Sequence, residues 1–494
     1  MTLRAFLLAT ALAAAATPAA TAAPATYYLD CQPGDDTAAG TSPDAPWRTL
    51  AQAGAHTFAP GERLLLKRGT GCKGMLTLHG KGADGAPVRI DAYGSESESK
   101  PHIEGGGARA ALHLLNTEQW EIRNLDLSNT GPITTTDHRA GLYVELTDYG
   151  VAHHFVVEDV DIHNVNGDDS KDPDPSGGIL FAANGDKTPT WFDDIRVSRS
   201  TVRTVDRTGI GTSSTWGHKA GANQRQSTGV TFTDNKVYDV GGDGIVVQDS
   251  RGALVEHNYV DGFNMRSPKH YNAGVWAWDS DDVLYQYNEV THGHGTLDSM
   301  AYDIDGGNNR NVYQYNYSHD NEGGFLLVCN DKSMESKGNR VHDNISINDR
   351  NTDTSSYGVV TVSCAASIDT RVYRNTIVTD RSGTELVHNN GLTGVIFEDN
   401  VFVGAAGGGA LISDADSTYS HNLYWPTDYS RDAAGVHADP MFTSAKPVAP
   451  DDVRLKDGSP ARGAGMGGEH DGAKHDYFGN PIPNPPNIGA DQSS

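Results

Sequence analysis

Short apolar segments that alternate with turns dominate the second half of this chain. Successive copies begin at Gly244, Gly274, Ala301, Gly324 and Gly358. Each copy reads as a strand of alternating side chains, a turn, and a second strand that ends in Asn. The alternation predicts β-strands, because successive side chains of a strand point to opposite faces. Long helical periodicity is absent, so the sequence predicts an all-β fold.

An Asn recurs at the end of these copies, at spacings of 22 to 31 residues. A repeat of this length, built only from short strands and turns, predicts a β-solenoid of roughly eleven or more coils. Each Asn amide is expected to donate to the Asn of one neighbouring coil and to accept from the other. An antiparallel up-and-down barrel is the rival fold, but its tight hairpins are not seen at every connection. The recurrent positions are Asn235, Asn258, Asn288, Asn316, Asn344, Asn375, Asn400 and Asn422.

Three stretches of the chain resemble the right-handed parallel β-helix proteins of the pectin-lyase-like superfamily. YYLDCQPGDDTAAG from residue 27 and DVRLKDGSPARGAG from residue 452 are similar to the terminal segments of extracellular carbohydrate-active members. SMAYDIDGG from residue 299 is similar to actinobacterial members mostly assigned as glycoside hydrolases. The resemblance implies one right-handed β-helix catalytic domain over residues 24–494. Within it, we expect an N-terminal capping region at 24–110 and a C-terminal tail at 430–494 that packs on the helix.

Residues 1–23 read as an export signal. Arg4 precedes an apolar run, and small residues follow it up to Ala23. The run is too short to span a membrane, so the sequence predicts a secreted, extracellular protein. An exported chain permits disulfides. Cys31 with Cys72 would tie down the N-terminal region, and Cys329 with Cys364 lie near corresponding strand positions of consecutive copies.

The chain is acidic, with 64 Asp and Glu against 38 Lys and Arg and a formal net charge of −26. This charge argues against nucleic acid or an anionic membrane as a partner. It also disfavours a polyanionic substrate unless a cation intervenes. We expect a monomer, because solenoid ends are usually capped. Nothing in the sequence argues for an organic cofactor, and no residue is assigned as a metal ligand.

The segment Tyr302-Asp-Ile-Asp305 carries the candidate chemistry. If Tyr302 and Ile304 face inward, Asp303 and Asp305 share the outer face, roughly 6–7 Å apart at about 3.3 Å per residue. One acid to protonate the leaving oxygen and one further carboxylate are what glycoside hydrolysis needs. Coupling between close carboxylates raises one pKa, which suits a general acid. Glu322, about one coil later, is the third catalytic candidate.

Alternation also predicts the side chains around these acids. Trp276 and Trp278 occupy the outer face of the preceding strand, where an exposed indole is costly unless it stacks on a sugar ring. A long loop that buries the tryptophans is the alternative. In the resembling superfamily the substrate groove lies on this outer strand face. The other substrate-binding candidates are Gln248, Asp279, His294, Asp298 and, if Leu326 and Val328 face outward, Asn330.

The residues leave several functions open. The favoured one is a secreted hydrolase of a neutral glycan such as xylan, arabinan or a pectin side chain. A calcium-assisted polysaccharide lyase is the main alternative, but it needs a basic residue, and the predicted outer strand face has no Lys or Arg. Asp-x-Asp-Gly-Gly also suits a structural calcium ion. A non-catalytic solenoid would not need convergent acids, and an esterase of the pectin-methylesterase kind would add an Arg beside them.

Overall fold

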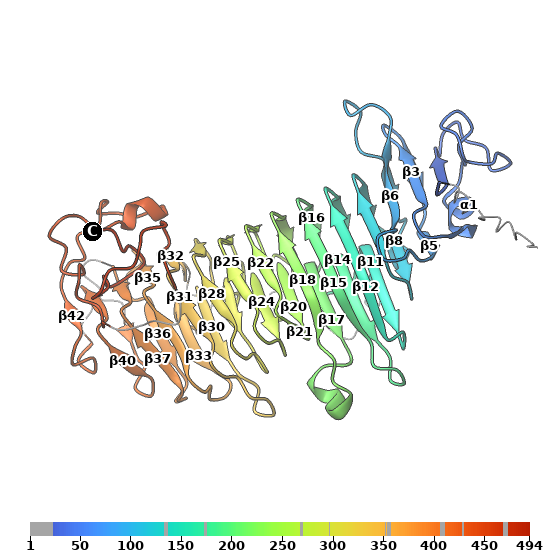
Figure 1. Ribbon diagram of the computed structural model, residues 1–494. Coiled ribbons are helices and arrows are strands. Elements are labelled where there is room, and N and C mark those ends of the chain that lie inside the picture. The colour runs from blue at the N-terminus through green and yellow to red at the C-terminus, as the bar shows by residue number, and fades with distance from the viewer. Residues whose placement is uncertain are drawn as a thin grey trace, which may run out of the picture.

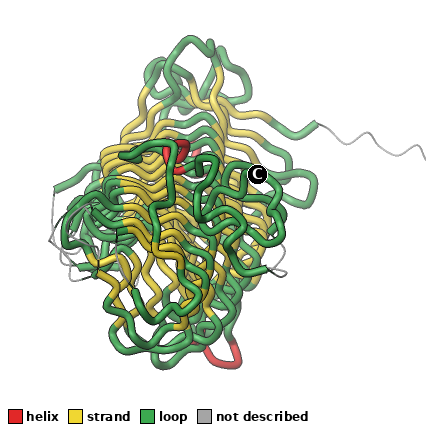
Figure 2. The backbone as a smooth tube through the Cα atoms, turned by 90° about the vertical axis from the view of Figure 1, so that its left-hand side faces the viewer, coloured by secondary structure: helices red, strands yellow, loops and turns green. Residues whose placement is uncertain are grey.

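The computed structural model describes residues 23–132, 137–171, 175–266, 270–295, 297–350, 352, 357–405, 411–426, 429–467 and 473–494. The predicted export signal therefore lies outside the described residues except for Ala23. The chain winds into a long solenoid of three parallel sheets (Figure 1). Viewed end-on, the strands of successive coils stack behind one another (Figure 2). No helix in the described part of the chain is long and apolar enough to cross a membrane.

Sheet A holds 15 strands. They are β1 (Thr26–Leu29), β3 (Arg63–Lys67), β6 (Val88–Tyr93), β9 (Trp120–Arg123), β12 (Val151–Glu158), β15 (Trp191–Ser198), β18 (Ser227–Thr233), β22 (Leu254–Glu256), β25 (Leu284–Gln286), β28 (Val312–Gln314), β31 (Arg340–His342), β34 (Thr370–Tyr373), β37 (Val395–Glu398), β40 (Thr418–Ser420) and, beside β18, β21 (Ser250–Arg251).

Sheet B holds 14 strands. They are β4 (Gly71–Lys73), β7 (His102–Glu104), β10 (Asp126–Asn129), β13 (Asp161–Val165), β16 (Thr201–Val205), β19 (Lys236–Val240), β23 (Tyr259–Asp261), β26 (Glu289–Thr291), β29 (Tyr317–His319), β32 (Ile345–Ile347), β35 (Thr376–Val378), β38 (Val401–Val403), β41 (Leu423–Trp425) and β42 (Val436–His437).

Sheet C holds 13 strands and carries the predicted acids. They are β2 (Thr57–Phe58), β5 (Leu76–Gly80), β8 (Ala110–Leu115), β11 (Ala140–Thr147), β14 (Gly177–Asn184), β17 (Thr208–Ser214), β20 (Ile245–Gln248), β24 (Val275–Trp278), β27 (Tyr302–Ile304), β30 (Leu326–Cys329), β33 (Val360–Ser363), β36 (Glu385–Asn389) and β39 (Leu411–Ile412). The helices are α1 (Leu50–Ala55) and the 3₁₀ turns η1 (His218–Asn223) and η2 (Pro450–Val453).

The predicted Asn ladder is present at the turn between sheets A and B. From Asn235 to Asn400, each side-chain amide donates to the Asn of the next coil at 2.9–3.0 Å. Each amide also donates to a backbone carbonyl of the preceding coil, as Asn288 does to Val255 at 2.8 Å. Asn422 ends the ladder by donating to the Asp432 carboxylate at 3.0 Å. The ladder thus satisfies polar groups that the turn buries.

Both predicted disulfides are formed. Cys31 is bonded to Cys72, with Cα atoms 5.4 Å apart, and Cys329 is bonded to Cys364, with Cα atoms 5.0 Å apart. The second bridge lies at the end of β30, on the sheet that carries the acids.

Chain segments near both termini pack against the solenoid. At the N-terminal end lies α1, whose first turn is capped by the Thr49 side chain (Figure 1). The earliest strands, β1 to β7, already pair within the three sheets. Near the other end, the C-terminal segment packs Phe442, Val453, Leu455 and Ile488 on apolar side chains of sheet B such as Ile345.

Candidate functional site

The predicted acids sit on the outer face of sheet C, beside the predicted tryptophans. Asp303 of β27 is the register partner of Trp276 on β24. Tyr302 and Ile304 point into the core, as predicted, and both are buried. The Tyr302 hydroxyl donates to the Asn288 carbonyl at 2.9 Å, which fixes β27 against the turn that carries the Asn ladder.

The prediction for the following strand is wrong by one residue. Asp303 pairs with Leu327 of β30, whereas Leu326 and Val328 lie in the core. A shift of one residue moves every side chain of a strand to the opposite face. Asn330 therefore does not continue the outward set: its amide is used to hold the carbonyls of Met334 and Ala366, at 3.1 and 3.0 Å.

Trp276 is covered, so the prediction that both tryptophans are exposed is wrong. Only 4% of Trp276 is accessible, and the Lys171 ammonium lies 4.7 Å from the centre of its ring. Lys171 comes from the loop between β13 and β14, and β14 lies three strands from β24 in sheet C. Trp278 stays partly exposed and packs against the cluster of Val246, Ala273 and Trp276.

Asp303 is a buried carboxyl group without a full set of partners. It is 4% exposed, and its Oδ1 receives no hydrogen bond from any described residue. Burial, followed by the charges of Asp305 and Asp298, raises the pKa of Asp303 well above 3.8. The buried side chain therefore favours its protonated form, because removing a charge from water is costly.

Asp305 and Asp298 complete a group of three acids around Asp303. Burial raises the pKa of Asp305 to about 7, against a hydrogen bond from the Gly306 N–H that lowers it. Burial also raises the pKa of Asp298 to about 6, although the N–H groups of Asn272 and Ser299 donate to its Oδ1. The Lys171 charge lowers all three pKa values.

Lys171 is joined by two residues that the sequence analysis missed, Asp243 and Arg207. The Asp243 carboxylate lies 3.9 Å from the Lys171 ammonium and 2.9 Å from the buried Arg207 guanidinium. Asp243 also accepts the Trp276 indole N–H at 3.0 Å, so it fixes the ring beside Asp303. The sequence offers one signal for Asp243: it directly precedes the copy that begins at Gly244. The turn there leads into sheet C and adjoins its outer face.

Gln248 lies on the partly exposed outer end of β20, next to this group. A small cavity of about 20 Å³ is lined by Lys171, Arg207, Asp243, Val246 and Gln248. Gly211 on β17 is the register partner of Val246 and lines the same cavity, which a side chain at that position would narrow.

Glu322 is not brought into contact with the aspartates. Its Oε2 lies 2.6 Å from His294 Nδ1 and accepts the Gly295 N–H at 3.1 Å. The cause is the turn between sheets B and C, where the Glu322 N–H donates to the Gly293 carbonyl and stacks Glu322 over the preceding coil. Glu322 and the half-exposed His294 form a pair of their own.

Asp279 anchors the loop that contains η1 beside sheet C. Its carboxylate accepts the backbone N–H of His218, at the start of η1, and its carbonyl accepts from Gln226 at 3.2 Å. The loop that contains η1 projects from the solenoid (Figure 1) and lines one side of an open cavity of about 460 Å³. The cavity lining includes His218, Arg251, Asp279, Asp281 and Glu335.

The comparisons with known proteins agree with this architecture. A family described as right handed beta helix region matches residues 177–361. Lacto-N-biosidase of Bifidobacterium longum subsp. longum is 27% identical over 523 aligned residues, which cover 86% of this chain and 32% of that protein. The chain thus spans about a third of the length of this curated relative.

Two solved structures resemble most of the solenoid. The GH136 lacto-N-biosidase from Eubacterium ramulus has a TM-score of 0.65 and 24% identity, over 80% of this chain and 67% of that one. The complex of XylC with xylose has a TM-score of 0.55 and 11% identity, over 95% of this chain and 98% of that one. The fold is therefore a right-handed parallel β-helix, as predicted.

Proposed function

We propose that this protein is a glycoside hydrolase that cleaves a neutral oligosaccharide or polysaccharide on the outer face of sheet C. The observation that carries the proposal is the buried Asp303, which lacks a partner at Oδ1 and stands beside Asp305 and two tryptophans. The similarity to lacto-N-biosidase supports the same class of reaction. We also propose that the protein is secreted, on the basis of the export signal in residues 1–23.

In this mechanism Asp303 is the general acid. Its raised pKa keeps a proton on the side chain near neutral pH, and that proton is donated to the glycosidic oxygen as the bond to the sugar breaks. Asp305 is the second carboxylate, which either attacks the anomeric carbon or activates water. Since the two groups titrate as a coupled pair, the pair carries one proton and one charge in its working state.

The surroundings of the pair have separate tasks. The partly exposed face of Trp278 is suited to stack on a sugar ring. Gln248 can bind hydroxyl groups from the neighbouring rung. Lys171 and Arg207 balance part of the charge of Asp243 and the three acids, so that the aspartates can ionise in a buried site.

A polysaccharide lyase is the second candidate, and Lys171 is the observation that favours it. The strands of the outer face carry no Lys or Arg, which disfavours a lyase, whereas Lys171 reaches that face from a distant loop. Its ammonium, however, is engaged with Asp243 and Trp276. Three neighbouring acids would also repel a uronate chain unless a cation bridged them.

The test is incubation with a panel of glycans, with two readouts in the same samples. The panel contains lacto-N-biose oligosaccharides, xylan, arabinan and polygalacturonate. New reducing ends without absorbance from unsaturated uronate are the expected result, and the proton spectrum of the fresh product then gives the stereochemistry. Unsaturated products would establish the lyase. Absence of both signals across the panel would contradict the proposal.

A further inference from the structure

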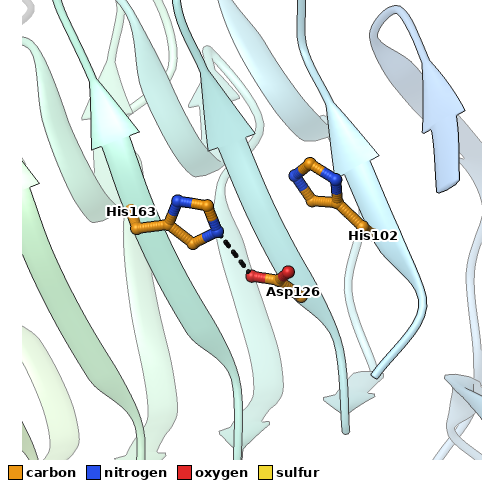
Figure 3. Close-up of side chains that lie close together, drawn as sticks. All are labelled: His102, Asp126 and His163. Atoms are coloured by element: carbon orange, nitrogen blue, oxygen red, sulfur yellow. Dashed lines mark ion pairs between the residues drawn. The ribbon is translucent and has the colours of Figure 1, made fainter. Parts of the chain in front are cut away.

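Three ligand-type side chains meet on sheet B, away from the acids of sheet C. His102 of β7, Asp126 of β10 and His163 of β13 come from three consecutive coils (Figure 3). His102 and Asp126 are register partners, and His163 pairs with Ser128, two residues beyond Asp126. Side chains at these positions share the outer face, so His163 reaches diagonally toward Asp126.

The three ligand atoms lie within 4.8 Å of one another. The closest pair is His163 Nε2 and Asp126 Oδ1, at 3.0 Å. The two imidazole rings stack at 5.7 Å between centres, on either side of the Asp126 strand. Tetrahedral zinc, with bonds of about 2.0–2.1 Å, holds its ligand atoms about 3.4 Å apart. Small side-chain rotations are enough to reach that geometry.

The cluster is under-satisfied by the protein itself. Asp126 Oδ1 is buried and receives no hydrogen bond from any described residue, although it lies close to His163. Only 17% of the His163 side chain and 27% of the Asp126 side chain are accessible. Ser128 lies between the histidines and hydrogen-bonds His102 Nε2 at 2.8 Å. In the described part of the chain, this is the one group of three such ligands within reach of a single ion.

We propose that His102, Asp126 and His163 form a transition-metal site, and that zinc is the ion it fits best. Two imidazoles and one carboxylate suit zinc, whereas calcium and magnesium prefer all-oxygen sets. Water or the Ser128 hydroxyl completes the coordination. A bound ion would link three consecutive coils near the N-terminal end of the solenoid, through one ligand from each. It does not depend on the proposed hydrolase activity, because it lies on a different sheet.

Zinc titration of the full chain, after treatment with a chelator and dialysis, tests the site by calorimetry at pH 7.5. We expect one zinc ion per chain and a higher Tm with zinc, since a ligand that binds only the folded state stabilises it.

Two variants and a matched control make the test specific. His163→Gln and, independently, Asp126→Asn should each weaken zinc binding by about 100-fold or more, because loss of a direct ligand exceeds the 10- to 100-fold cost of losing its supporting partner. The control is His292→Gln, a half-exposed histidine that contacts a single carboxylate, Asp261 Oδ1, at 2.7 Å. It should bind zinc like the wild type. Absence of zinc binding in the wild type, or equal affinity in all variants, would overturn the site.

Discussion

Replacement of Asp303 by Asn removes the proposed proton donor and almost nothing else. The amide has the shape of the carboxyl group, and Asp303 forms no ion pair with a described residue that the change would break. Loss of general acid catalysis costs about 10²–10⁴-fold in rate. At 1.36 kcal/mol per tenfold, that is about 2.7–5.4 kcal/mol of transition-state free energy.

The same variant should be more stable than the wild type at neutral pH. The folded-state pKa of Asp303 is raised above its unfolded value of 3.8, so the native state binds more protons than the unfolded state between those two pH values. The contribution of Asp303 to stability is therefore present below about pH 4 and is lost as pH rises toward the raised pKa. Asn does not titrate and avoids this loss. A buried charged group without a full set of hydrogen bonds costs at least about 1–3 kcal/mol, and the removal of that charge is the gain we expect at pH 8.

The gain corresponds to a small rise in Tm. At about 2.1 cal/mol/K per residue, a chain of this length has an unfolding entropy of about 1 kcal/mol/K, so Tm should rise by about 1–3 °C at pH 8 and by less at pH 4. Calorimetry at both pH values and initial rates on the best glycan are the assays. Asp261→Asn, which removes the partly exposed partner of His292, is the matched control for an unchanged rate. A wild-type rate in the Asp303 variant, or a fall in Tm at pH 8, would refute the reasoning.

Five further substitutions probe the neighbourhood and the scaffold. Lys171→Met removes a charge that lowers the pKa of the general acid, whereas Asp298→Asn removes a charge that raises it. The alkaline limb of the pH–rate profile should therefore move to higher pH in the first variant and to lower pH in the second, and limbs that move in the same direction would contradict this electrostatic picture. Trp278→Ala should raise KM by about 5- to 150-fold, the value of about 1–3 kcal/mol of ring contact, while kcat changes less; an unchanged KM would remove it from the binding surface. Asn316→Ala leaves the Asn288 amide and the Tyr285 carbonyl without their partner and should lower Tm by about 3–5 °C in calorimetry. Asn309→Ala, outside the ladder, should lower Tm by about 1 °C, and equal losses would show that the ladder contributes no more to stability than other Asn side chains.

The fold could be predicted because its determinants are local and repeat. The Asn positions recur at one turn, and each makes the same two kinds of bond, so a pattern in the sequence maps directly on a ladder in space. The disulfides followed from the same alignment of coils. The prediction for β30 slipped by one residue because Phe325-Leu-Leu-Val328 is apolar throughout and offers no alternation to fix its register.

The site was harder to predict because its remaining parts come from turns of different length. Alternation alone placed Asp303 beside Trp276. Lys171 lies more than 100 positions earlier, in a loop whose path over the sheet no periodicity records. Glu322 turned toward His294 because backbone bonds at the corner fix its direction. The His102, Asp126 and His163 cluster escaped notice because 24 and 37 positions separate its members in coils of irregular length.

The Asn ladder has a consequence for how such a protein can change. Its members are 22 to 31 residues apart, yet every coil from Asn235 to Asn422 is held in phase at that one turn. Differences in length between these coils therefore fall at the other two corners, between sheets B and C and between sheets C and A. A loop at those corners can be lengthened, shortened or exchanged without altering the stacking of the coils behind it. One scaffold could thus be fitted to different glycans by grafting corner loops, while the strand that bears the two aspartates stays as it is.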